Sequence, residues 1–246
     1  MMKGHVSETL AVIMRRKRFR RRFRATTRAL AAALFLASLS AFPPAGHAAP
    51  PAQRPETAEQ PSPTTCRDIS GAGADDAWLV GDGGFIFKTR DGGATWLPQD
   101  SGTGEDLLAV SVVDTSTAWA AGRRGTVLKT GDGGSAWEIL DPGTGKDVYD
   151  ISAAGPDTAW AVCEGPLVLR TADGGATWEH LDPGNLNPLL RITAIDASTA
   201  WAAGENGTVL RTADGGETWV LQPCGTGDHL KALAVRDADH AWAGGE

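Results

Sequence analysis

Residues 171–178 read Thr-Ala-Asp-Gly-Gly-Ala-Thr-Trp, and copies of this octapeptide stand at 89–96, 130–137 and 212–219, each 41 residues from the next. The copy at 130–137 departs most, because Ala136 replaces the threonine before the tryptophan. In an Asp-box turn of this kind the Asp carboxylate accepts backbone N–H groups, and the glycines supply positive φ angles. We therefore predict structural roles for Asp91, Asp132, Asp173, Asp214, Trp96, Trp137, Trp178 and Trp219.

A second set of tryptophans keeps the same 41-residue step, at positions 78, 119, 160, 201 and 242. The two sets together account for all nine tryptophans. Around them each unit contains four short alternating stretches, in the second unit 107–113, 117–122, 126–130 and 135–140. A repeat of about 40 residues with four antiparallel strands is typical of a β-propeller blade. We expect the tryptophans on the second strands to be buried and those after the Asp-boxes to pack between blades.

The sequence thus predicts an all-β propeller with four-stranded antiparallel blades at 66–98, 105–140, 146–181 and 189–222 and a partial blade at 228–246. Seven blades, the number expected below, would need about 287 residues. From Cys66 onward 181 residues remain. We therefore expect about 4.5 blades in an open arc that is truncated at its C-terminal end.

Residues 1–48 have the pattern of an export signal peptide. A basic stretch from Arg15 to Arg28 precedes an apolar run at 29–42, and small residues follow before a cleavage point after Ala48. The run is too short for a bilayer core of roughly 30 Å, so we expect no transmembrane span and a periplasmic, lumenal or extracellular protein. The alternative, a basic nucleic-acid-binding tail, leaves the apolar run unexplained. The sequence leaves the choice between Sec and twin-arginine export open.

Residues 49–65 form a Pro-rich segment that we expect to be a disordered linker. Beyond residue 48 the chain has 13 basic and 29 acidic residues, so it repels phosphate backbones and nucleic acid is excluded as a partner. The three cysteines, Cys66, Cys163 and Cys224, have no metal-ligand spacing. We therefore predict neither a metal site nor a cofactor.

The most regular unit reads Thr-Ala-Trp-Ala-Ala-Gly at 199–204, Gly-Thr-Val-Leu-Arg-Thr at 207–212 and Ala-Asp-Gly-Gly-Glu-Thr-Trp at 213–219. This unit resembles the blade of the photosystem II assembly/stability factor family and its many bacterial relatives. The resemblance covers residues 66–246. It implies a seven-bladed propeller that acts as an assembly or scaffolding factor on membrane-protein complexes.

Two loops of each blade, the turn between its second and third strands and the connector to the next blade, should reach one face. The turns vary where the rest of the repeat is fixed, and variable loops on a rigid scaffold are where binding usually occurs. As partner-binding residues we predict Arg123, Arg124, Glu164, Glu205 and Asn206. The two arginines can pair with carboxylates of a protein partner or with acids of this chain, and the turns can also be plain solvated loops.

Four cations at 88, 129, 170 and 211 keep the repeat spacing as well. They form either a ring for an anionic partner or a set of aliphatic stems that cover the tryptophans while the charged heads stay in water. We favour the second interpretation.

Asp-boxes also occur in sialidases and other glycosidases. A sialidase needs a tyrosine nucleophile with three arginines, and the sole tyrosine, Tyr149, lies in a first strand without a legible set of this kind. We assign no catalytic residue and expect no enzyme activity. A sialidase-like or other glycan-active hydrolase, or a lectin, is the alternative function.

Overall fold

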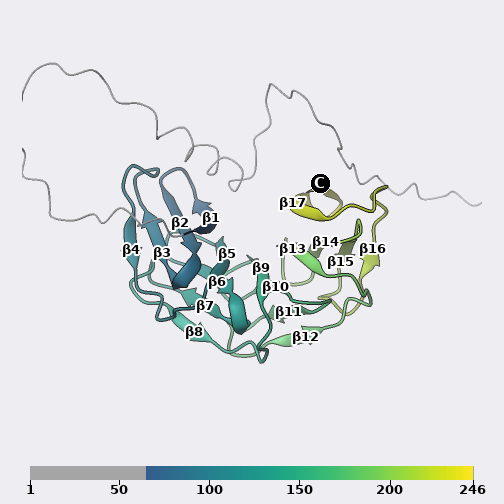
Figure 1. The fold of residues 1–246 in the computed structure, drawn as a ribbon, viewed down its shortest axis with the longest axis horizontal. Coiled ribbons are helices and arrows are strands. Elements are labelled where there is room, and N and C mark those ends of the chain that lie inside the picture. The colour runs from purple at the N-terminus through teal and green to yellow at the C-terminus, as the bar shows by residue number, and fades with distance from the viewer. Residues whose placement is uncertain (1–64, 246) are drawn as a thin grey trace, which may run out of the picture.

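The computed structural model describes residues 65–245. The predicted signal peptide at 1–48 and nearly all of the linker at 49–65 lie outside these residues. Figure 1 shows five sheets side by side in an open arc, in which the first and last sheets do not meet. The predicted all-β propeller arc is therefore confirmed.

The first four sheets each contain four antiparallel strands in chain order, and the fifth contains two. The first strand of each sheet lies at the centre of the arc and the fourth at its rim (Figure 1). The strands are β1 Cys66–Ala72, β2 Asp76–Gly81, β3 Ile86–Thr89, β4 Leu97–Gln99, β5 Leu107–Val112, β6 Ala118–Gly122, β7 Val127–Thr130, β8 Glu138–Leu140, β9 Val148–Ala153, β10 Ala159–Cys163, β11 Val168–Thr171, β12 Glu179–Leu181, β13 Leu189–Ala194, β14 Ala200–Gly204, β15 Val209–Thr212, β16 Val220–Leu221, β17 Leu230–Asp237 and β18 His240–Gly245.

Each Asp-box is a closed hydrogen-bonded turn. In the first, Asp91 accepts the backbone N–H of Thr95 at 2.8 Å and its hydroxyl at 2.6 Å. These bonds, the hydroxyl first, lower the pKa of Asp91 to about 2. At Asp132 the backbone N–H of Ala136, and after it the hydroxyl of Thr130, lowers the carboxyl pKa, but no hydroxyl donates from position 136. Because the turn holds residue 136, β8 begins at Glu138, later than the predicted start at Ser135.

The second-strand tryptophans are the centre of the packing, as predicted. Trp78, Trp119 and Trp160 are fully buried and Trp201 is nearly so. The Asp-box tryptophans pack between neighbouring blades: Trp119 meets Trp178 edge to face at 6.1 Å, and Trp160 meets Trp219 in the same way. Each pair joins one blade to the next and adds about 0.5–1.5 kcal/mol beyond area burial.

The four repeated cations also join blades. Each lies over the second-strand tryptophan of its own blade, from Lys88 at 3.8 Å to Arg211 at 5.8 Å from the ring centre. Lys88 Nζ further donates to the carbonyls of Thr115 and Gly133 in the second blade, at 2.8 and 3.2 Å. The prediction that all the heads stay in water is wrong for Lys88, which is 3% exposed, because the next blade covers it.

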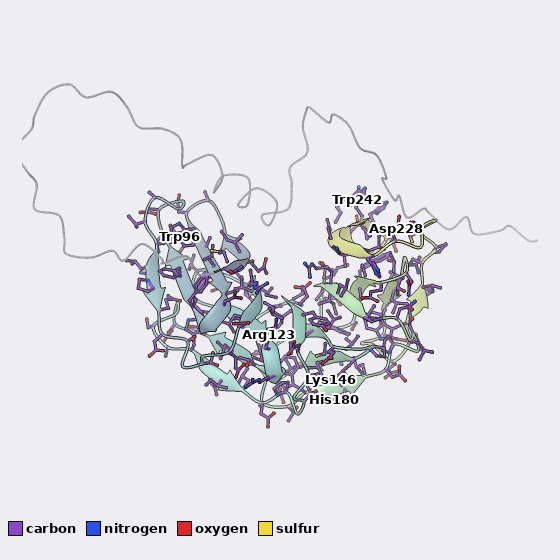
Figure 2. All side chains as sticks on the ribbon, viewed as in Figure 1. Trp96, Arg123, Lys146, His180, Asp228 and Trp242 are labelled. Carbon is purple, nitrogen blue, oxygen red and sulfur yellow. The ribbon has the colours of Figure 1, made fainter. Side chains whose placement is uncertain are left out.

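The fifth sheet leaves its tryptophan partly uncovered. Trp242 on β18 is 37% exposed, unlike its four buried equivalents, because among the described residues no further sheet packs on it. Trp96 lies at the opposite end of the arc (Figure 2). The buried positions of the repeat thus depend on a neighbouring blade.

Candidate functional site

The loops that connect the sheets come together on one face of the arc. In blade two the N–H of Arg123 donates to the carbonyl of Asp106 in the preceding connector at 2.9 Å. In blade three Glu164 donates in the same way to Asp147, and in blade four Glu205 donates to Pro188. Every second-to-third-strand turn therefore lies against the connector before it, and together they form what we call the loop face.

Each of these turns contains a left-handed backbone position whose residue type varies, and in three of them a left-handed glycine (Gly84, Gly125 or Gly207) follows it. The varying position is occupied by Gly83, Arg124, Gly165 and Asn206, with φ values of 71°, 53°, 80° and 53°. Glycine adopts this conformation freely and asparagine tolerates it, whereas a long side chain pays about 1–2 kcal/mol. Arg124 is thus the one residue of the four that holds its place at a clear conformational cost. Strain of this kind is characteristic of functional sites.

The two predicted arginines have different surroundings. Arg123 donates from Nε to Asp106 at 3.0 Å and from Nη1 to Asp147 at 3.1 Å, so its guanidinium bridges two connectors. The side chain of Arg124 donates to Glu105 at 3.0 Å and is 78% exposed, while its backbone N–H donates to Asp147 Oδ1 at 3.0 Å. Of the two pairings that the sequence allowed, with carboxylates of a partner or with acids of this chain, both arginines make the second in this structure. A surface pair such as Arg124–Glu105 contributes 0–1 kcal/mol and exchanges readily.

The other predicted residues lie on the same face but have weaker connections to one another. Glu164 is exposed and Glu205 is half-buried. Asn206 donates from Nδ2 to Asn187 Oδ1 at 3.0 Å. The loop face therefore changes along the arc, from arginine–carboxylate pairs in the first two blades to a carboxamide pair in the fourth.

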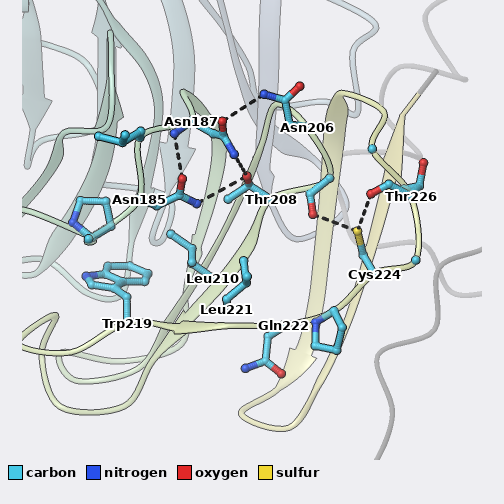
Figure 3. Close-up of a pocket in the computed structure, with 17 residues that line it drawn as sticks. Asn185, Asn187, Asn206, Thr208, Leu210, Trp219, Leu221, Gln222, Cys224 and Thr226 are labelled. Atoms are coloured by element: carbon cyan, nitrogen blue, oxygen red, sulfur yellow. Dashed lines mark hydrogen bonds between the residues drawn. The ribbon is translucent and has the colours of Figure 1, made fainter.

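Sequence reasoning missed a groove of about 800 Å³ next to Asn206, between the connectors at 183–187 and 222–227 (Figure 3). Its rim holds Asn185 and Asn187, whose Nδ2 atoms lie 3.5 and 2.9 Å from the hydroxyl of Thr208. Its floor is apolar. The signal for it was present in the connector sequence Asn-Leu-Asn-Pro at 185–188, which departs from the other connectors.

Sequence reasoning also missed a second cavity, of about 470 Å³, on the central strands. Tyr149 and Asp150 from β9, Arg191 from β13 and Arg67 from β1 line it together with Lys231 from β17. Burial, and then the negative charges of Glu164 and Asp147, raise the pKa of Tyr149. Arg67 donates from Nε to Asp82 at 2.6 Å. The residues come from blades far apart in the chain, so no local sequence motif predicts the cavity.

Other chemistry on the described residues is limited. Within residues 65–245 no three His, Cys, Asp or Glu side chains gather in a way that could hold a metal ion. Cys66, Cys163 and Cys224 are free thiols, and burial raises the pKa of Cys163 to about 12. The same part of the chain contains no helix long and apolar enough to cross a membrane.

Comparison with solved structures finds propellers of several functions. A structure described as YCF48 bound to D1 peptide is 18% identical, with 76% of this chain and 92% of that chain covered and a TM-score of 0.44. The WD40 propeller domain of Doa1 is 15% identical, with 76% and 64% covered and a TM-score of 0.57. A GH74 xyloglucanase from Xanthomonas campestris is 13% identical, with 69% and 33% covered and a TM-score of 0.54. The last two share the fold.

Sequence comparison identifies the family. Among curated proteins there is no significant match. The sequence model of the family described as Photosynthesis system II assembly factor YCF48 matches residues 51–144 and 135–223, which together are well over half of the chain. Because the match includes the Asp-box turns and the buried tryptophans that build the blades, this protein belongs to the photosystem II assembly factor YCF48 family.

Proposed function

We propose that this protein is an exported, non-catalytic scaffold that binds a protein partner through its loop face during assembly of a membrane-protein complex. Membership of the YCF48 family supports the assembly role. The basic and apolar pattern of residues 1–48 supports export. The observation that carries the binding proposal is Arg124, an exposed arginine in a strained backbone conformation within a strongly acidic chain.

Arg124 is suited to binding a carboxylate of the partner. Its guanidinium has several N–H donors, and in the free protein only Nη1 is engaged, by Glu105. A partner carboxylate can replace Glu105 because the existing pair is solvent-exposed and weak. Arg123 instead positions the turn, since Asp106 and Asp147 hold its guanidinium from both sides. Glu164, Glu205 and Asn206 extend the same face toward the fourth blade.

The test distinguishes an effect of the Arg124 side chain on partner binding from an effect on the stability of the turn. We would replace Arg124 by glycine, which accepts a φ of 53°, and use Arg90→Gly as the control, because Arg90 is an exposed arginine in the Asp-box turn at the end of β3 opposite the loop face. The Arg124→Gly protein should be unchanged in stability or gain up to about 1 kcal/mol. Capture of the partner from native membranes by the full-length protein should nevertheless fall about tenfold, as expected for a lost charge-assisted bond.

The control defines the outcomes. Arg90→Gly removes an arginine away from the loop face, keeps Arg124 and should retain most of the capture. If Arg124→Gly captures the same membrane proteins as the wild type, the loop face does not bind through this arginine and the proposal fails. If Arg124→Gly lost both capture and stability, the claim that Arg124 serves binding and not the stability of the turn would be wrong.

One observation favours the alternative of a sialidase-like hydrolase. The central cavity brings Tyr149 together with Arg67 and Arg191, the residue types that such an enzyme uses. Two features weaken it: the raised pKa of Tyr149 makes a poor nucleophile, and Asp82 already engages Arg67. Hydrolysis of a sialoside or of xyloglucan by the wild type, abolished by Tyr149→Phe, would establish the alternative.

A further inference from the structure

The groove beside Asn206 is particular to the fourth blade, and the repeat shows why. Three of the four connectors carry Thr-Gly at their tips, at 103–104, 144–145 and 226–227. The connector between the third and fourth blades instead carries Asn185 and Leu186, followed by Asn187 and Pro188. The side chain of Leu186 is 93% exposed. The repeat gives no packing reason for a leucine at this place.

In the preceding blades a side chain of the outer strand fills the equivalent space. Ile139 lies against Gly102, and His180 Nε2 is 2.8 Å from the carbonyl of Pro142. In blade four the equivalent residue is Leu221, which is about as exposed as Ile139 (62% against 58%) but does not reach the connector. Nothing lies within 4 Å of the position that a Cβ on Gly184 would take. The groove is therefore an opening left by this chain's own departures from its repeat.

The lining of the groove is uncharged. Seventeen residues line it, and none is Asp, Glu, Lys, Arg or His. Carboxamides from Asn185, Asn187, Asn206 and Gln222 supply polar groups, while Leu210 and Leu221 lie at the centre of the floor (Figure 3). In a chain with a large excess of acidic residues, a neutral surface of this size selects a ligand without charge, because an ion would be desolvated here without a counter-charge.

We propose that this groove binds an extended, uncharged segment of a partner protein, with one apolar side chain placed against Leu221 and Leu186. A carboxamide carries a donor and an acceptor and therefore matches the N–H and C=O of a peptide main chain. On the rim the oxygens of Asn185 and Asn187 already accept hydrogen bonds from this chain, and one N–H of each amide is directed to Thr208. The second N–H of each amide and the side-chain oxygen of Gln222 are the groups with which such a segment would pair. This proposal rests on the proposed function and names the chemistry of the segment that the fourth blade recognises.

A carbohydrate fits the groove less well. Sugar rings stack on exposed aromatic faces, and the one aromatic residue of the groove is Trp219. Its ring is half-buried and packs edge to face with Trp160 at 6.1 Å. The exposed apolar groups are leucines, which match an aliphatic side chain. A peptide segment thus uses features of the groove that a sugar would leave unused.

The experiment uses three probes on the mature protein. The first is a pool of N-acetylated, C-amidated heptapeptides built from Leu, Val, Phe, Ser, Thr and Asn. The second pool has Asp or Glu at alternate positions, and the third probe is a mixture of xyloglucan oligosaccharides. The variant is Leu186→Asp, and the matched control is Leu97→Asp, which changes an exposed leucine on β4 outside the groove.

We expect the uncharged pool to bind best and Leu186→Asp to weaken that binding about tenfold or more, with little effect of Leu97→Asp. Equal binding of the two pools, equal effects of the two substitutions, or preference for the oligosaccharides would overturn the proposal. Capture of the partner from native membranes distinguishes a failure of the groove proposal from a failure of the proposed loop-face function. If Arg124→Gly loses capture and Leu186→Asp affects neither capture nor peptides, only the groove proposal fails. If capture survives both, the loop-face function fails.

Discussion

Replacing Gln99 by leucine should weaken the joint between the first two blades. Gln99 Oε1 accepts the indole N–H groups of both Trp78 and Trp137, each at 3.1 Å. Its Nε2 donates to the carbonyl of Gly133 at 3.1 Å. One side chain therefore satisfies three buried or half-buried groups on two blades. In the second blade the equivalent residue is Leu140, and there the indole nitrogens of Trp119 and Trp178 have no hydrogen-bond partner among the described residues.

The magnitude follows from the groups left behind. Two buried indole donors without acceptors cost about 1–3 kcal/mol each. The carbonyl of Gly133 keeps a partner, because Lys88 Nζ still donates to it at 3.2 Å. Leucine returns about 1–2 kcal/mol through greater apolar burial. The free energy of unfolding should therefore fall by about 2–3 kcal/mol at the middle of these ranges, which corresponds to roughly 2–4 °C in the melting temperature for each kcal/mol.

Urea unfolding of the mature protein, followed by tryptophan fluorescence, measures this change, and an unaltered m-value would show that the unfolding reaction is the same. The reciprocal variant Leu140→Gln is the internal control. It offers an acceptor to the indoles of Trp119 and Trp178, so it should lose less stability than Gln99→Leu or gain some. The reasoning would be refuted if Gln99→Leu matched or exceeded the stability of the wild type.

Three further predictions concern the Asp-boxes, the blade interface and export. Ala136→Thr should supply a hydroxyl from position 136 to Asp132, which should lower the pKa of Asp132 in an NMR titration and raise the melting temperature. Folding lowers the pKa of the other three Asp-box aspartates to about 2. The stabilisation that these three carboxylates give is therefore complete above roughly pH 4 and disappears toward pH 2. Gly216→Ala should cost about 2–4 kcal/mol in urea unfolding, because its Cβ would lie 2.5 Å from Leu181 Cδ1 and its φ is 91°. N-terminal sequencing of the native protein should begin near Ala49, and an intact Arg15–Arg28 segment would contradict the signal-peptide interpretation.

The regular part of this protein could be predicted from the sequence because the repeat itself encodes it. A residue that recurs every 41 positions experiences the same surroundings in each blade, so the burial of Trp119 and Trp160 follows from their spacing alone. The Asp-box turn is local, and its bonds span four residues, as in Asp173 to Thr177. Neither inference required knowledge of how the blades pack against one another.

The candidate site could be predicted only as a set of loops. Whether Arg123 or Arg124 is free to bind depends on the distance to Asp106 and Asp147, which are brought near by the path of two connectors. The central cavity depends on residues from all five described sheets. The groove depends on the space left between Gly184 and Leu221, which no motif records. Distances between blades decide all three cases.

Departures from the repeat are therefore of two kinds, and only the structure tells them apart. Some departures are used by the fold itself: Gln99 holds two tryptophans, and Arg123 holds two connectors. Others have no such use: Arg124 remains exposed in a strained turn, and Leu186 remains exposed on a connector. Changes at the first kind should lower stability, whereas changes at the second should leave stability intact and alter binding. If Arg124→Gly and Leu186→Asp both changed stability but not binding, departure from the repeat would carry no information about function in this propeller.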